Sequence, residues 1–183
     1  EDFVNSLYEM SPGIYGFPVT AFKQAIVDVS HKDKGIARTV MQASIYLDSD
    51  IVRVRPALAG AICDMPLVRI YGSKPEMRED MGRVGSGLNK VATLLYRAQF
   101  TTWAVRISGE LNASQVPAEA FISAVNDAGR VKGVGEWRNE HKGVFGAFRL
   151  ADMAEDEAWT AFAEGRGPIP VRITPVPGMK IAA

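Results

Sequence analysis

The N-terminal third of the chain alternates between helical and strand-like spacing of its apolar residues. Helical spacing predicts a helix over residues 19–32. From residue 41 to residue 47 the apolar positions occur at every second residue, which is typical of a half-buried strand. A short acidic turn and a second alternation over residues 51–55 follow, so we expect a hairpin here.

The middle of the chain contains three predicted strands and one segment without a strand pattern. The strands are residues 67–71, 92–100 and 103–108, and the last two are expected to pair as a second hairpin. Residues 72–90 carry charge and glycine but little alternation, so they are expected to form a short helix and a mobile loop.

The C-terminal third contains the clearest helical pattern. An apolar stripe follows Pro117 at helical spacing and is expected to end at Gly129, because proline favours the first turn of a helix and glycine its C-terminal cap. Two short strands are expected at 131–138 and 144–150, and an acidic helix at 152–163. The proline-rich segment 165–183 is expected to be an extended arm.

Hairpins interspersed with amphipathic helices indicate an α+β fold. The expected arrangement is ferredoxin-like or RRM-like, an antiparallel sheet with two helices on one face, an inserted basic loop and a C-terminal arm. The open face of such a sheet can stack bases on aromatic and arginine side chains. We assign residues 1–150 to this domain and residues 151–183 to the acidic helix and the arm.

Composition narrows the classes of function. The 183 residues include 21 Lys or Arg and 21 Asp or Glu, so the formal charge is zero and a strongly basic tail binder is excluded. The single cysteine, Cys63, and the two histidines, His31 and His141, argue against a metal centre. With no membrane-spanning segment, a cytoplasmic protein without a cofactor or metal is expected.

Charge is unevenly distributed along the neutral chain. Residues 65–106 hold seven basic and three acidic residues, residues 128–150 hold five and two, and residues 151–164 hold five acidic residues and no basic one. A basic centre beside an acidic helix would bind a phosphate backbone. The alternative is a solvated surface with local ion pairs.

The segment 131–149 is rich in glycine, aromatic and basic residues. Glycines allow close approach to a polyanion, and exposed rings can stack on bases. The alternative is a glycine-rich hairpin that places Trp137 in the core. The segment lacks the spacing of the Walker and dinucleotide-binding motifs.

Two family resemblances follow from these residues. Gly133-Val-Gly-Glu-Trp-Arg138, a turn and Gly143-Val-Phe-Gly-Ala-Phe148 resemble the glycine-rich loop of the RAMP superfamily, which supplies backbone and RNA-processing subunits of CRISPR effectors. Residues 16–23, 74–83 and 145–148 resemble an uncharacterised family of small tailed-phage proteins. The first resemblance implies a ferredoxin-like fold that binds single-stranded nucleic acid, often as a helical array of subunits.

The leading hypothesis is therefore a phage-encoded, non-catalytic protein that binds single-stranded DNA or RNA and assembles along the strand as a homo-oligomer. A structural or interaction protein, such as a virion component or an inhibitor of a host complex, is the alternative, with a phage or host protein as its partner. An RNA endonuclease using His31 is a third hypothesis, because RNA-cleaving RAMP members carry a histidine near the N-terminal helix. The expected nucleic-acid-binding residues are Lys74, Arg78, Arg83, Lys90, Tyr96, Gly133, Gly135, Trp137, Arg138, Lys142, Gly143, Phe145 and Gly146.

Overall fold

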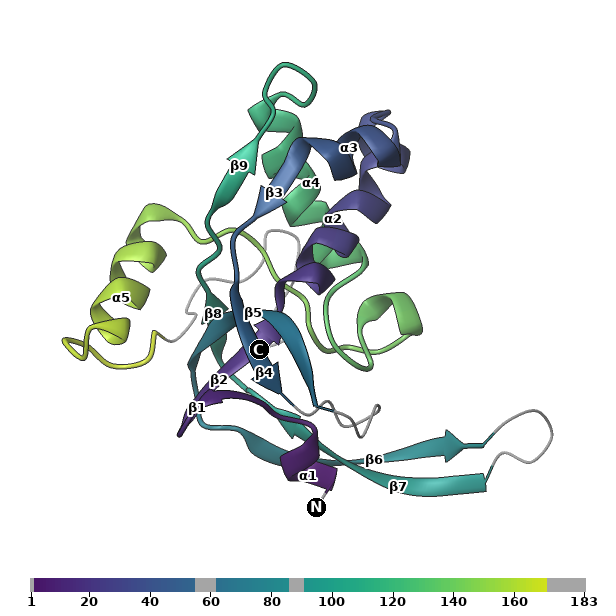
Figure 1. Cartoon of the computed structure of the whole chain (residues 1–183), viewed down its shortest axis with the longest axis vertical. Coiled ribbons are helices and arrows are strands. Elements are labelled where there is room, and N and C mark those ends of the chain that lie inside the picture. Colours follow the sequence, from purple (N-terminus) through teal and green to yellow (C-terminus); the bar gives the residue numbers. More distant parts are fainter. Residues whose placement is uncertain (1, 55–61, 86–90, 171–183) are drawn as a thin grey trace, which may run out of the picture.

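The structure is a computed structural model that describes residues 2–54, 62–85 and 91–170, and its architecture is α+β, as predicted (Figure 1). The helices are α1 (Asp2–Asn5), α2 (Val19–Lys34), α3 (Arg38–Ser44), α4 (Ala118–Val131), the 3-10 turn η1 (Asn139–His141) and α5 (Met153–Ala163). The strands are β1 (Tyr8–Ser11), β2 (Ile14–Pro18), β3 (Ile45–Leu47), β4 (Asp50–Val54), β5 (Cys63–Gly72), β6 (Glu76–Val84), β7 (Val91–Gln99), β8 (Trp103–Val105) and β9 (Gly109–Leu111).

The main sheet has the order β1-β2-β5-β4, and β8 pairs with the end of β5. Both β2 and β4 run antiparallel to β5, so they are parallel to each other and are joined through α2 as a split β-α-β unit. In the described part of the chain no strand follows α4 to complete a second such unit. The neighbour of β2 is instead β1, which precedes it. Within the described residues, the strand order therefore does not match the complete ferredoxin-like arrangement that was expected.

Helix α2 joins two clusters of buried side chains. Phe22 packs with Val68 of the sheet and Val134, which follows α4, and is 4% exposed. Farther along α2, Ile26 and Val29 pack with residues of α3, α4 and β3. The predicted helix over 19–32 is therefore confirmed, and it connects the sheet to the helical part of the molecule.

The segment predicted as a helix and loop, 72–90, contains strand β6. Strands β6 and β7 form a long antiparallel hairpin that extends away from the sheet (Figure 1). Met77 and Met81 are four residues apart, as on a helix face, but here they lie on one face of the hairpin beside Ala98 and Leu94 of β7. The predicted pairing of 92–100 with 103–108 is also wrong, because β7 pairs with β6 and β8 with β5.

The alternating segment 41–47 is a strand only at its end. Residues 38–44 form α3, whose Met41 is fully buried among the helices. Strand β3 pairs with β9 and β4 pairs with β5, so the expected hairpin over 41–55 does not form. Packing of Met41 against α2 and α4 favours a helix over the strand that the local pattern indicates.

Helices α4 and α5 confirm the predicted C-terminal helices. Helix α4 continues through Gly129, and an added Cβ there would lie 1.8 Å from the carbonyl oxygen of Phe148. Helix α5 begins at a capping box formed by Asp152 and Glu155. Residues 165–170 have no regular structure, and the rest of the predicted arm, 171–183, lies outside the described residues.

Candidate nucleic-acid interface

The segment between α4 and α5 folds as a compact loop, which we call the glycine-rich loop (residues 133–148). The predicted strands 131–138 and 144–150 are not formed, apart from one bridge between Arg138 and Phe145. Positive φ angles at Gly133, Gly135, Trp137, Lys142 and Gly146 explain this, because extended strands require negative φ.

Backbone hydrogen bonds close the glycine-rich loop onto itself and onto α4. The amide of Val134 donates to the carbonyl of Gly146 at 2.9 Å, and the amide of Phe145 donates to that of Trp137 at 3.2 Å. The amide of Phe148 donates to Gly129 of α4 at 3.2 Å. The loop is thus a folded element attached to the end of α4.

Two of its glycines are required by this packing. An added Cβ at Gly143 would lie 1.6 Å from the carbonyl oxygen of Trp137, and one at Gly146 would lie 1.7 Å from that of Val134. Around Gly135, by contrast, the nearest atom to an added Cβ is Cζ of Phe17 at 3.9 Å. Internal packing therefore accounts for Gly143 and Gly146, whereas Gly135 has open space beside it.

Trp137 and Lys142 are the exposed side chains of the loop that suit a nucleic acid. Trp137 has φ 53° and is 43% exposed, so it lies outside the core. Lys142 has φ 62°, is exposed and has no carboxylate partner among the described residues. A ring for stacking and a free ammonium group therefore occur on the same loop.

Arg138 is held inside the loop by Glu140. Its Nε and Nη2 atoms donate to Glu140 at 3.1 and 2.9 Å, and Nη1 donates to the carbonyl of Gly135 at 3.1 Å. Glu140 also accepts a hydrogen bond from Lys132. Hydrogen bonds from Lys132, which has the larger effect, and from Arg138 lower the pKa of the Glu140 carboxyl group.

This arrangement makes part of the stability pH-dependent. A lowered pKa stabilises the folded state above the unfolded-state pKa of about 4.3, and this contribution is lost as the pH falls through the folded-state value. At pH 7, Glu140→Gln should lower the free energy of unfolding by about 0.5–1.5 kcal/mol, as expected for two exposed ion pairs. The difference from wild type should vanish in urea titrations well below pH 4.

Glu157→Gln is the matched control, because Glu157 is exposed on α5 and has no ion pair within the described part of the chain. It should leave the unfolding free energy unchanged at both pH values. An equal loss of unfolding free energy in both variants would contradict the role of Glu140 in the loop. So would a loss in Glu140→Gln that persists below pH 4.

The base of the β6–β7 hairpin lies against the glycine-rich loop. The guanidinium of Arg78 in β6 stacks over the ring of Phe145 at 4.3 Å from its centroid. Nε of Arg97 in β7 donates to Glu136 at 3.0 Å. The two stretches enriched in basic residues therefore meet in space, at the junction between hairpin and loop.

Two other predicted site residues, Tyr96 and Lys74, lie away from this junction. Tyr96 is on the opposite face of β7 from Arg97, because side chains alternate along a strand. Lys74 lines a separate cleft at the end of β5. The side chain of Arg83 and the whole of Lys90 are outside the described residues.

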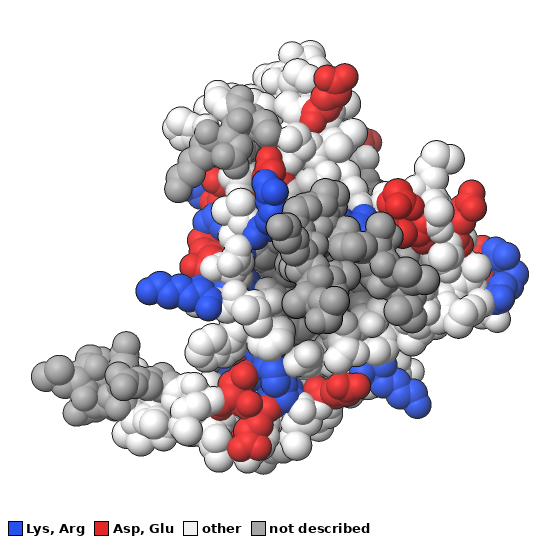
Figure 2. All heavy atoms as spheres, turned by 180° about the vertical axis from the view of Figure 1, so that it is seen from behind, with Lys and Arg blue, Asp and Glu red and all other residues white. Residues whose placement is uncertain are grey.

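Local ion pairs neutralise most of the arginines. Arg78 pairs with Asp80 at 2.6 Å, and Arg106 pairs with Asp156 of α5 at 2.9 Å. Figure 2 shows basic and acidic side chains interspersed over one face of the molecule. Within the described residues, the alternative of a solvated surface with ion pairs therefore describes the arginines better than a uniform basic groove.

Sequence reasoning missed the acidic residues that organise the site. Glu136 and Glu140 were counted only against the basic charge of the segment. The spacing Arg138-x-Glu140 could have indicated their ion pair, because it is local. The pair between Arg97 and Glu136 joins distant parts of the sequence and had no such signal.

The third hypothesis requires a catalytic histidine. His31 is exposed near the end of α2, and His141 is exposed in η1. The described residues contain no cluster of three His, Cys, Asp or Glu side chains that would hold a metal ion.

None of the helices described is both long and apolar enough to cross a membrane.

Comparison of the chain with models of protein families, with curated proteins and with solved structures gives no match. Inferences about function therefore depend on the geometry of the chain itself.

Proposed function

We propose that the protein binds single-stranded nucleic acid, without catalysis, at the junction of the glycine-rich loop and the β6–β7 hairpin. The observation that carries this proposal is the exposed Trp137 on a folded loop whose neighbour Phe145 is fixed to the hairpin by Arg78. A rigidly held, exposed ring loses little conformational entropy when a base stacks on it.

Single strands are favoured over duplexes by the chemistry of the loop. An indole ring can stack only on a base whose face is accessible, and bases in a duplex are already stacked. Because Arg78, Arg97 and Arg138 are paired with carboxylates, few cations remain for phosphates, with Lys142 the clearest of them on the loop. The affinity should therefore depend only modestly on salt. For each phosphate contacted, the logarithm of the association constant should fall by about 0.7 for every tenfold increase in salt concentration.

Trp137→Ala should weaken binding of a labelled 20-nucleotide single strand by about 1–3 kcal/mol, which is roughly a 5- to 150-fold increase in Kd. The expected loss corresponds to one stacked base. Fluorescence anisotropy with single-stranded DNA, single-stranded RNA and a duplex at two salt concentrations measures it and identifies the preferred strand.

Tyr46→Ala is the matched control, because Tyr46 is a 65% exposed aromatic residue of β3, which pairs with β9 and not with the loop. Its affinity should equal that of wild type. Equal binding by wild type and Trp137→Ala, or the absence of strand binding at low salt, would refute the proposal.

One observation favours the second candidate, a structural or interaction protein. The hairpin face that carries Met77, Met81 and Leu94 exposes these large apolar side chains, at 62%, 67% and 45%, around Glu79. A protein partner would bury such side chains. Light scattering on the anisotropy samples should show particle growth when the strand is added, and growth without nucleic acid would favour the interaction protein.

A further inference from the structure

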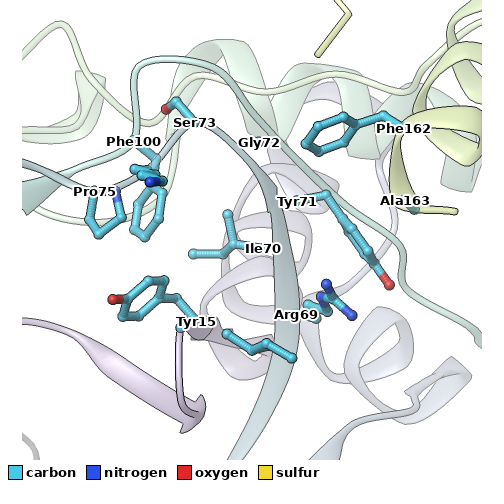
Figure 3. A pocket seen from close by; sticks show the side chains of 13 residues that line it. Tyr15, Arg69, Ile70, Tyr71, Gly72, Ser73, Pro75, Phe100, Phe162 and Ala163 are labelled. Atoms are coloured by element: carbon cyan, nitrogen blue, oxygen red, sulfur yellow. The ribbon is translucent and has the colours of Figure 1, made fainter. Parts of the chain in front are cut away.

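A cleft opens where β2 and β5 stop pairing. Their ladder ends at Gly16 and Arg69, beyond which β5 pairs with β8 on residues 70–72. The cleft between the separating strands has a volume of about 180 Å³, and Phe162 of α5 is among the residues that line it. Figure 3 shows Tyr15 and Phe100 on one side of Ile70, and Arg69, Tyr71 and Phe162 on the other.

Aromatic rings line both sides of this cleft. The rings of Tyr15 and Phe100 contact each other with centroids 5.9 Å apart. Tyr71 carries the guanidinium of Arg69 over its ring, at 4.6 Å. All four rings that line the cleft are only partly buried, so their faces and edges remain accessible to a flat, aromatic ligand.

The charge of the cleft is uncompensated. Among arginines with described side chains, Arg69 alone has no carboxylate within 4 Å among the described residues, whereas Arg38, Arg53 and the others are paired. Lys74 also lines the cleft and has no described acidic partner, and no Asp or Glu is among the lining residues. Two cations without a carboxylate favour an anionic ligand.

The turn that carries Lys74 is held in place before any ligand binds. Oγ of Ser73 accepts hydrogen bonds from the amide of Thr101 at 3.0 Å and from that of Thr102 at 3.3 Å. This clamp fixes the turn 72–75 beside the end of β7. Lys74 therefore starts from an anchored backbone, which lowers the entropic cost of binding.

We infer that this cleft binds a nucleoside monophosphate unit, with the base against Tyr71 and Phe162 on the Arg69 side of β5 and the phosphate at Arg69 and Lys74. Rings alone would suit any apolar ligand, and cations alone would suit any anion, but a nucleotide combines both groups in one molecule. The inference rests on the proposed function in one respect, since the unit is taken to belong to the bound strand. It adds a second contact to the one at Trp137.

Calorimetric titration with AMP tests the cleft apart from the loop. AMP should bind more tightly than adenosine or inorganic phosphate, and Arg69→Ala should weaken AMP binding about tenfold or more, as for a lost charged hydrogen bond. Arg53→Ala is the control, because Arg53 pairs with Asp64, which lies five residues, or about 17 Å, along β5 from Arg69. Trp137→Ala should leave AMP binding unchanged.

Anisotropy with the single strand separates this inference from the proposed function. If both are right, Arg69→Ala and Trp137→Ala each weaken strand binding. If AMP does not bind and Arg69→Ala leaves strand affinity unchanged, the cleft is not a nucleotide site, while dependence on Trp137 would still support the proposed function. AMP binding through Arg69 with an unchanged strand affinity would assign the cleft to a free nucleotide and overturn its role on the strand.

Discussion

Gly146→Ala is expected to lower the free energy of unfolding by about 2–5 kcal/mol. A left-handed backbone costs a residue with a Cβ about 1–2 kcal/mol, and φ at Gly146 is 69°. The added carbon would also lie 1.7 Å from the carbonyl oxygen of Val134, whose amide donates the hydrogen bond to Gly146 that closes the loop, so relieving the clash would disturb that bond. Such forced backbone shifts typically cost a further 1–3 kcal/mol.

Gly165→Ala separates the two contributions. Gly165 has φ 72°, close to that of Gly146, but an added Cβ there would have no atom within 4 Å. It should therefore lose only the conformational part, about 1–2 kcal/mol. Urea unfolding of both variants measures the difference, and equal losses would show that the close approach inside the loop is unimportant.

The helices could be predicted from sequence because their information is local. The apolar stripe of α4 and the acidic cap of α5 lie within a few residues of the positions they determine. Such patterns predicted α2, α4 and α5 within a few residues at each end. The α+β class followed from their alternation with strands.

Strand pairing could not be predicted in the same way. The charged sequence of β6 becomes a strand because β7 supplies its partners across the hairpin, although its own residues show little alternation. Met41 likewise alternates with polar neighbours but is buried by α2 and by α4, which lies far along the sequence. Contacts outside the local segment decided both cases.

The candidate site shows the same division. Composition marked the glycine-rich segment but left Trp137 either exposed or in the core, and Gly143 and Gly146 were expected at the site from the resemblance of the loop. Internal packing explains why these two positions are glycine, and the sequence alone cannot distinguish this explanation from the close approach of a ligand. The contact between Arg78 and Phe145, and the unpaired Arg69 of the cleft, depend on the folded chain.

The attachment of the loop to the sheet leads to the second large effect. Phe22 of α2 contacts the rings of Phe17, Trp103 and Phe148, at 5.9, 6.4 and 5.4 Å between centroids. It therefore joins the sheet, α2 and the end of the glycine-rich loop. Phe22→Ala should lower the free energy of unfolding by about 3–5 kcal/mol, as for buried phenylalanines in general.

A double-mutant cycle shows whether the loop shares this stabilisation. If the edge-to-face contact anchors the loop, Phe22→Ala and Phe148→Ala should be coupled by about 0.5–1.5 kcal/mol in urea unfolding. Phe22→Ala with Tyr46→Ala is the control cycle: Tyr46 is 65% exposed and its ring does not contact that of Phe22, so these changes should add within about 0.5 kcal/mol. Additive losses at Phe22 and Phe148 would mean that backbone hydrogen bonds alone hold the loop to α4, because the rings would then contribute nothing jointly.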